Sequence, residues 1–141
     1  MARILALDVG QKRTGISVTD PLQLIASALE TVSTAQLVPF LHKYLAAEKV
    51  DKLVVGLPVT LQNEPSSNHA LVLQIMKQLS RAFPTLQIET HDERFTSSMA
   101  KQTVLASGIN KKARQKKENM DKISATLILQ SYMEQRSMNN S

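Results

Sequence analysis

The sequence has no cysteine and no tryptophan among its 141 residues, and aromatic residues make up only 4%. The lack of cysteine excludes disulfides, thiolate metal ligands and a cysteine nucleophile. The shortage of aromatic side chains argues against a protein that binds single-stranded nucleic acid mainly by base stacking. No apolar run approaches the length of a membrane span, and the N-terminus has no signal-peptide pattern. We therefore expect a cytoplasmic protein with no membrane partner.

Glycine is also scarce, yet three of the four glycines lie in or beside the ends of predicted strands, at Gly10, Gly15 and Gly56. Glycine at such places lets the backbone turn tightly or approach a ligand closely. With 141 residues, of which 43% are hydrophobic, the chain is large enough for one domain with its own core. We expect a single domain over residues 1–135 and a flexible tail over residues 136–141.

Short apolar runs alternate with amphipathic segments along the chain, and this order indicates an α/β protein. Strands are expected at residues 4–7, 14–19, 24–31, 52–56 and 86–91. Helices are expected from residue 37 onward, before Pro84, over 97–108 and over 121–133. This order predicts a mixed five-stranded sheet with helices on both faces. The first, fourth and fifth strands should be parallel, with ligands bound beyond their carboxyl ends.

Asp8 stands at the end of the first apolar run, where a carboxylate is costly to bury unless it has a partner. One interpretation is a turn aspartate that bonds its own backbone in the bend at Gly10. The other is an acid that holds a metal ion or activates a substrate at the strand end. The first run alone leaves both interpretations open.

Asp121 begins the last predicted helix, in line with its apolar stripe. The stripe consists of Ser124, Ala125, Ile128, Leu129 and Tyr132. Helical spacing therefore turns Asp121 toward the sheet. An aspartate in a first helical turn also stabilises the helix dipole, by about 0.3 to 1 kcal/mol, without any chemical role. Its place on the face that is otherwise buried favours a functional role.

Asp8, Asp121 and Glu93, which follows the fifth strand, are predicted to converge at one edge of the sheet. Three nearby carboxylates repel one another unless a cation neutralises them. Oxygen ligands without histidine or cysteine are typical of Mg²⁺ or Mn²⁺, which also bind substrate phosphates. Such ions can activate water and stabilise the leaving oxygen of a phosphodiester. The three acids therefore predict a metal-dependent nuclease, in which they are both metal ligands and catalytic residues.

The formal net charge is +5, and basic residues crowd the segment just before Asp121. The cations of this segment are Lys111, Lys112, Arg114, Lys116 and Lys117, with Lys122 following closely. Such a cluster predicts contacts to the phosphates of a nucleic acid. A solvated charge run on a loop has the same composition, and this alternative stays open.

Three further cations lie near the predicted acids: Lys12 and Arg13 in the first turn, and Arg94 next to Glu93. Each could contact a phosphate. The alternatives are simple solvation for the first two and an ion pair with a neighbouring acid for Arg94. His91 invites a general-base interpretation because its ordinary pKa lies near neutrality, but a histidine at a strand end more often packs or hydrogen-bonds.

Four segments in order carry a family resemblance: ALDVGQKRTGIS, VVGLP, HDERFTS and DKISATLILQSY. They resemble the YqgF or RuvX family, bacterial proteins described as pre-16S rRNA nucleases and as Holliday-junction-resolvase-like proteins. The resemblance implies a ribonuclease H-like fold and a metal-dependent phosphodiesterase that matures the small-subunit ribosomal RNA. It implies precursor rRNA, or alternatively branched DNA, as the partner. The family's acidic motif residues fall on Asp8, Glu93 and Asp121.

One segment departs from the family pattern. Many members have an Asp-Gly turn shortly after the GLP segment, whereas this chain has Gln62-Asn63 there. Asparagine tolerates the left-handed conformation, so the turn can persist while the contacts of the loop differ.

Two other functions share this sequence pattern. The Asp-x-Gly turn after a first strand also resembles the phosphate loop of actin-like ATPases, which would make the protein a nucleotide-binding module. Those proteins enclose the nucleotide between two such domains, and this chain has room for one. The other alternative is an inactive nucleic-acid-binding protein of the same fold. The sequence does not predict whether the protein is a monomer or a homodimer.

Overall fold

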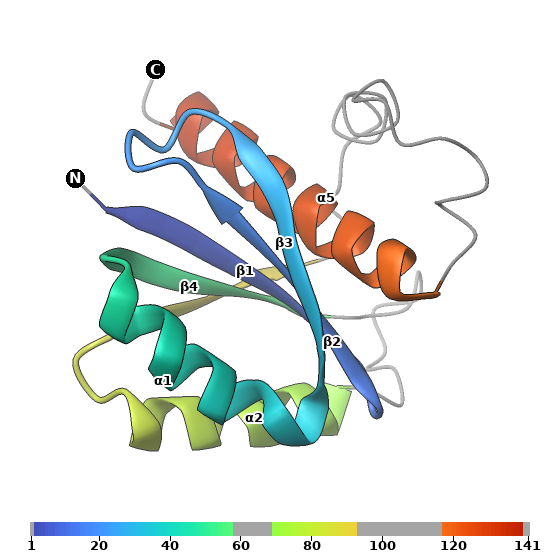
Figure 1. The fold of residues 1–141 in the computed structure, drawn as a ribbon. Coiled ribbons are helices and arrows are strands. Elements are labelled where there is room, and N and C mark those ends of the chain that lie inside the picture. The colour runs from blue at the N-terminus through green and yellow to red at the C-terminus, as the bar shows by residue number, and fades with distance from the viewer. Residues whose placement is uncertain (1, 58–68, 93–116, 140–141) are drawn as a thin grey trace.

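The computed structural model describes residues 2–57, 69–92 and 117–139 of the chain. Within these ranges, five strands form one mixed sheet (Figure 1). The strands are β1 (Arg3–Val9), β2 (Arg13–Thr19), β3 (Ala26–Ser33), β4 (Val50–Leu57) and β5 (Gln87–Asp92). Their order across the sheet is β3-β2-β1-β4-β5, so the first strand lies at the centre.

The three N-terminal strands form an antiparallel meander, and the remaining two extend the sheet in parallel. β1 pairs antiparallel with β2, which pairs antiparallel with β3. β1 also pairs parallel with β4, and β4 pairs parallel with β5. The predicted mixed five-stranded sheet is confirmed. The carboxyl ends of β1, β4 and β5 lie at one edge of the sheet, which is the edge where such folds bind ligands.

Helices cover both faces of the sheet (Figure 1). The short helix η1 (Thr34–Gln36) leads into α1 (Leu37–Ala47), which shares one face with α2 (His69–Ala82). Helix α5 (Lys117–Asn139) covers the other face. The helix expected over residues 97–108 lies outside the described residues. None of the helices in the described ranges is long and apolar enough to span a membrane.

Successive residues of β1 point to opposite faces of the sheet and enter two different cores. Leu5, Leu7 and Val9 pack with α1 and α2. Ile4 and Ala6 pack beneath α5. All five are at most 4% exposed. Because the central strand is covered on both faces, its sequence is a continuous apolar run without polar alternation.

The core on the α1 and α2 face follows helical spacing. Val72, Ile75 and Leu79 of α2 are buried, three and four residues apart. Leu37 and Leu41 of α1 are buried beside them. Pro39 is the third residue of α1, and at that position in the first turn its missing N–H breaks no hydrogen bond within the helix.

The strand boundaries all lie within two residues of the expected ones, and β3 and α5 show the largest shifts. β3 begins at Ala26 because the Asp20 carboxylate accepts the amides of Leu24 and Ile25, both at 2.8 Å, and holds these residues in the β2–β3 loop. The bonds from the amides of Ile25 and Leu24 lower the pKa of Asp20. α5 extends beyond the expected 121–133 at both ends, and at its C-terminus it continues through residues expected to form a tail.

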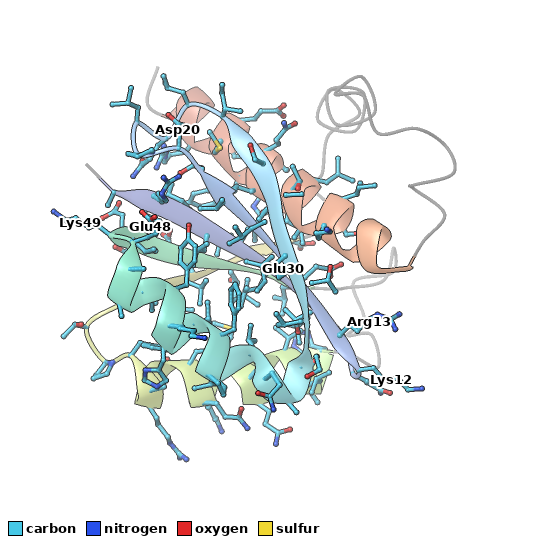
Figure 2. The ribbon with its side chains drawn as sticks, in the orientation of Figure 1. Lys12, Arg13, Asp20, Glu30, Glu48 and Lys49 are labelled. Atoms are coloured by element: carbon cyan, nitrogen blue, oxygen red, sulfur yellow. The ribbon has the colours of Figure 1, made fainter. Side chains whose placement is uncertain are left out.

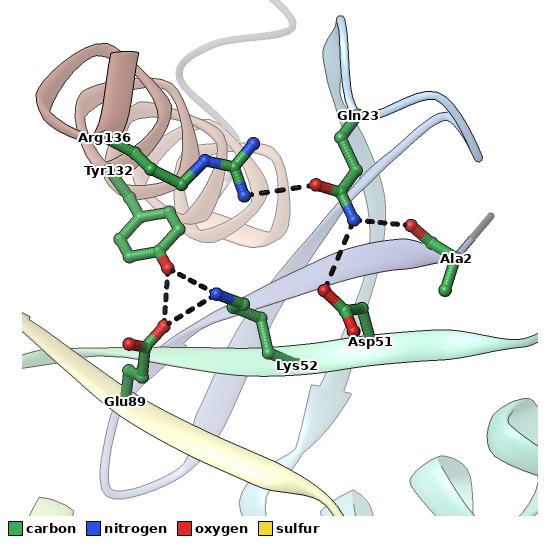
Figure 3. A network of polar contacts seen from close by, with 7 residues as sticks. All are labelled: Ala2, Gln23, Asp51, Lys52, Glu89, Tyr132 and Arg136. Atoms are coloured by element: carbon green, nitrogen blue, oxygen red, sulfur yellow. Dashed lines mark hydrogen bonds and ion pairs between the residues drawn. The ribbon is translucent and has the colours of Figure 1, made fainter. Parts of the chain in front are cut away.

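Polar contacts anchor the C-terminal half of α5 to the sheet (Figure 3). The Tyr132 hydroxyl donates to Glu89 at 2.5 Å and lies 3.1 Å from the Lys52 ammonium, which also donates to it. The bond that Tyr132 donates lowers the pKa of Glu89, and the bond that Tyr132 accepts raises the pKa of Lys52. Arg136 donates to the Gln23 side chain at 3.1 Å. These bonds fix the position of α5 along its own axis.

Candidate active site

Asp8 lies on the α5 face of β1. The residues beside it on the two neighbouring strands are glycines. Alternation along β1 puts Asp8 on the same face as the two apolar residues packed beneath α5. Its partner on β2 is Gly15, and on β4 the residue next in register is Gly56. The carboxylate is half-buried. Because glycine has no side chain, neither of these neighbours in the sheet places a side chain against Asp8.

The backbone includes Asp8 in the β1–β2 ladder rather than in the turn. Asp8 pairs with Gly15, and one further residue pair closes the ladder. The turn starts at Gly10, whose amide donates to the Arg13 carbonyl at 2.9 Å. A Cβ atom at Gly10 would come within 2.7 Å of that carbonyl oxygen, so the turn requires glycine. The main chain of Asp8 therefore belongs to the strand, and the bend begins after it.

The N-terminal half of α5 reaches the same edge of the sheet (Figure 1). The Ser17 hydroxyl donates to the Ala125 carbonyl at 2.8 Å, and Ser17 pairs with Ala6 of β1. Asp121 comes one turn before Ala125, about 6 Å along the helix. Asp8 comes two residues after Ala6, about 7 Å along the strand. The main chain of α5 at Asp121 is therefore level with the end of β1.

His91 of β5 is buried on this face and hydrogen-bonded to α5. It pairs in register with Gly56 and is 5% exposed. Its Nε2 atom lies 2.8 Å from the Ser131 hydroxyl oxygen, and Ser131 is 1% exposed. Burial lowers the pKa of His91, and the charge of Asp92 opposes this shift. These contacts agree with the interpretation that His91 packs and hydrogen-bonds, rather than with a general base.

Lys12 and Arg13 lie at the end of the sheet where Asp8 stands. Figure 2 shows both at the far end of the molecule from Asp20 and Lys49. Lys12 is exposed in the turn after β1, and Arg13 is half-buried at the start of β2. Positive charge therefore stands beside the edge that carries the Asp8 carboxylate.

The remaining predicted site residues are only partly described. Glu93 and Arg94 lie outside the described residues, as do Lys111, Lys112, Arg114 and Lys116. Lys117 and Asp121 belong to α5, where the structure describes their main chain. Among the side chains that are described, no three histidines, aspartates or glutamates form a group that could hold a metal ion.

The surroundings of Asp8 nevertheless fit a hard divalent cation. Aspartate oxygen is the donor type that Mg²⁺ and Mn²⁺ prefer. Mg²⁺ usually keeps several of its waters, so its site needs open space beside the protein ligand. Gly15 and Gly56, the neighbours of Asp8 across the sheet, have no side chains that could fill such a space.

Three polar contacts of this edge were not predicted from the sequence. Ser131 interrupts the apolar stripe of α5 three residues after Ile128, and such an interruption is a usable signal for a buried, hydrogen-bonded hydroxyl. Ser17 and Thr34 bind segments far away in the chain, and no local pattern indicates these bonds. The stripe also differs in detail, because Ser124 is only partly buried whereas Ile123 is 6% exposed.

Comparison with known families is decisive for the class of protein. A family model described as "RuvX: Holliday junction resolvase" matches residues 2–135. The chain belongs to this family. A relative from Bacteroides thetaiotaomicron is 48% identical over 136 residues, covering 96% of this chain and 99% of the relative. A relative from Flavobacterium psychrophilum is 47% identical over 133 residues, covering 94% and 97%. Both carry the name "Putative pre-16S rRNA nuclease".

Solved structures with low sequence identity share the fold of this family member. RuvC from Thermus thermophilus, in complex with a Holliday junction substrate, superposes with a TM-score of 0.60 at 15% identity, covering 97% of this chain and 98% of RuvC. The fowlpox virus resolvase bound to Holliday junction DNA gives 0.55 at 14% identity, covering 95% and 98%. The predicted ribonuclease H-like fold is confirmed, and the family confirms the predicted enzyme class, a nuclease.

Proposed function

We propose that the protein is a metal-dependent nuclease that cleaves structured RNA and processes the 5′ end of pre-16S rRNA. The observation that carries the proposal is Asp8, a half-buried carboxylate between two glycines at the carboxyl ends of parallel strands. The relatives are about as long as this chain, and their names support pre-16S rRNA as the substrate. A ribosomal RNA precursor as substrate implies that the protein acts in the bacterial cytoplasm.

Asp8, Glu93 and Asp121 are proposed to hold Mg²⁺ or Mn²⁺. Bound there, the metal would supply an activated water and stabilise the leaving oxygen of the phosphodiester. The proposal for Glu93 is supported by the strand before it, because Glu93 directly follows β5 in sequence and Glu89 and His91 of that strand both contact α5. The place of Asp121 is supported by the main chain of α5, which is level with Asp8 there.

The substrate track is proposed to consist of the cations around this edge. Lys12 lies in the turn that follows β1, the strand of Asp8, and Arg13 begins β2. Arg94 is next to Glu93 in sequence, and the basic segment precedes Asp121. The track comprises Lys12, Arg13, Arg94, Lys111, Lys112, Arg114, Lys116 and Lys117. Contacts from these side chains to phosphates position the nucleic acid without reading its sequence.

The test is cleavage of an RNA that contains the 5′ end of 16S rRNA with its precursor extension, in the presence of Mn²⁺ or of EDTA. We expect site-specific cleavage with Mn²⁺ and none with EDTA. Asp8→Asn should lose more activity than the roughly 10- to 100-fold typical of residues that only orient a metal ligand, while its stability holds or rises because carboxylate repulsion is relieved. Asp51→Asn makes the same chemical change at an exposed site on β4 and should cleave like the wild type.

Three results would contradict the proposal: wild-type cleavage by Asp8→Asn, unfolding of that variant, or cleavage that persists in EDTA. A four-way DNA junction assayed in parallel separates the alternative resolvase function. Faster cleavage of the junction than of the precursor RNA would identify branched DNA as the substrate.

A further inference from the structure

Thr34 ties the turn between β1 and β2 to the start of η1. Its hydroxyl donates to the Gly10 carbonyl at 2.6 Å, and its amide donates to the Lys12 carbonyl at 2.9 Å. The Thr14 hydroxyl lies 3.0 Å from the Thr34 hydroxyl. Because Thr34 has a single hydroxyl proton, which it gives to Gly10, Thr14 is the donor in that pair. One residue from a distant part of the chain therefore bonds both ends of the turn.

The turn that Thr34 holds connects Asp8 to Lys12. Gly10 follows Asp8 by two residues, and the bond from its amide to the Arg13 carbonyl closes the turn. The side chain of Lys12 is exposed at the tip. Exposed tips of this kind are mobile unless other parts of the fold hold them. The bonds from Thr34 therefore determine where the Lys12 main chain stands relative to the Asp8 carboxylate.

We propose that Thr34 is a positioning residue for substrate binding, which holds the turn so that the Lys12 ammonium meets a phosphate beside the scissile one. This inference rests on the proposed nuclease function. A cation on a mobile turn loses conformational freedom when it binds, and a main chain that is already ordered reduces this loss. Thr34 touches neither the substrate nor the reacting atoms and acts through Lys12.

The experiment compares two substitutions of Thr34 that separate its hydroxyl from its shape. Thr34→Val keeps the shape and removes the hydroxyl, whereas Thr34→Ser keeps the hydroxyl and removes the methyl group. Binding of a fluorescent structured RNA is measured in EDTA, so that no cleavage occurs, at several salt concentrations. Lys12→Ala is measured alone and combined with Thr34→Val.

The expected result is a coupling between the two positions. Lys12→Ala should reduce the slope of the log-log salt plot by about 0.7 to 0.9, which corresponds to one phosphate bound by this side chain. Thr34→Val should weaken binding about 2- to 10-fold and lower the slope in the same direction. Thr34→Ser should bind like the wild type. In the Thr34→Val background, Lys12→Ala should have a clearly smaller effect than in the wild type.

Three results would overturn the inference. Equal weakening by Thr34→Ser and Thr34→Val would show that the hydroxyl is not specifically responsible, because Thr34→Ser keeps it. An equal effect of Lys12→Ala in both backgrounds would make Thr34 merely structural. If Lys12→Ala left RNA binding unchanged in the wild type, Lys12 would not belong to the substrate track. The nuclease function is tested separately, by the cleavage assay with Asp8→Asn. Thermal unfolding checks each variant, and Thr34→Ala replaces Thr34→Val if the latter is unfolded at the assay temperature.

Discussion

The two faces of the sheet are held to their helices in different ways. On the face of α1 and α2, β1 contributes Leu5, Leu7 and Val9, and the contact is apolar throughout this strand. On the face of α5, β1 contributes Ile4 and Ala6 and then a carboxylate at Asp8.

Two polar side chains buried on the α5 face form hydrogen bonds between the sheet and the helix. Ser17 donates to the Ala125 carbonyl, and His91 bonds the Ser131 hydroxyl. Apolar burial is non-directional, so α1 and α2 need only cover their face. Hydrogen bonds require defined distances, and a buried polar group that loses its partner costs about 1–3 kcal/mol. The α5 face therefore sets the axial position of its helix, which is what a helix carrying Asp121 needs.

The largest effect is expected at the end of α5 that reaches the candidate active site. Asp121→Ala should reduce cleavage by more than about 100-fold if the residue is a metal ligand. Its free energy of unfolding should fall by no more than about 1 kcal/mol, the value of its interaction with the helix dipole. Cleavage assays and urea unfolding measure the two effects. A variant that loses mainly stability and keeps its activity would contradict the metal-ligand role.

A matched pair of core substitutions sharpens the comparison between the faces. Leu41 of α1 and Leu129 of α5 are both fully buried, so Leu41→Ala and Leu129→Ala should each cost about 2–5 kcal/mol of stability. We expect only Leu129→Ala to lower cleavage per folded molecule, because it loosens the helix that carries Asp121. The assays are made well below both unfolding midpoints. Equal cleavage by the two variants would show that the faces do not differ in this way.

A smaller effect is expected from the basic segment before α5. Replacing Lys111, Lys112, Lys116 and Lys117 by alanine should weaken RNA binding and reduce the salt slope by about 0.7 to 0.9 for each phosphate that the protein no longer binds. Metal affinity should barely change. Alanine at Lys43 and Lys77, exposed on the helices of the opposite face, is the control and should leave the slope unchanged. An unchanged slope in the fourfold variant would make the segment a solvated charge run.

The smallest effect concerns the polar anchor at the other end of α5. The Tyr132 hydroxyl holds the pKa of Glu89 below its ordinary value of 4.5, so the bond stabilises the fold above that pH and its contribution is lost as the pH falls through the lowered pKa. Glu89→Gln should therefore destabilise the protein at pH 7 and progressively less below about pH 4.5. Because the Glu89 side chain is 35% exposed, the loss should stay under about 1 kcal/mol. Tyr132→Phe should remove most of the same pH dependence, and unfolding curves at several pH values provide the measurement.

The position of Asp8 shows how far the sequence leads toward the site. An acid at the end of a continuous apolar run, followed by Gly10, indicates a strand end with an unusual role. The choice between a turn residue and a residue of the sheet surface depends on pairing with Gly15, which brings together two strands. The place of Asp121 on the α5 stripe follows from helical spacing, but its level along the sheet depends on the bond between Ser17 and Ala125.

The amino-acid sequence was sufficient to predict the order of the elements, the mixed sheet, the family and the acids that are candidates for the site. These follow from periodicity, turn residues and motifs, which are local along the chain. The hydrogen bonds that hold the candidate site in place could be identified only from the tertiary structure. The bonds of Thr34 to Gly10 and of His91 to Ser131 join segments 24 and 40 residues apart. A hydrogen bond needs its two groups within about 3 Å, and no local pattern records which distant segments the packed core brings that close.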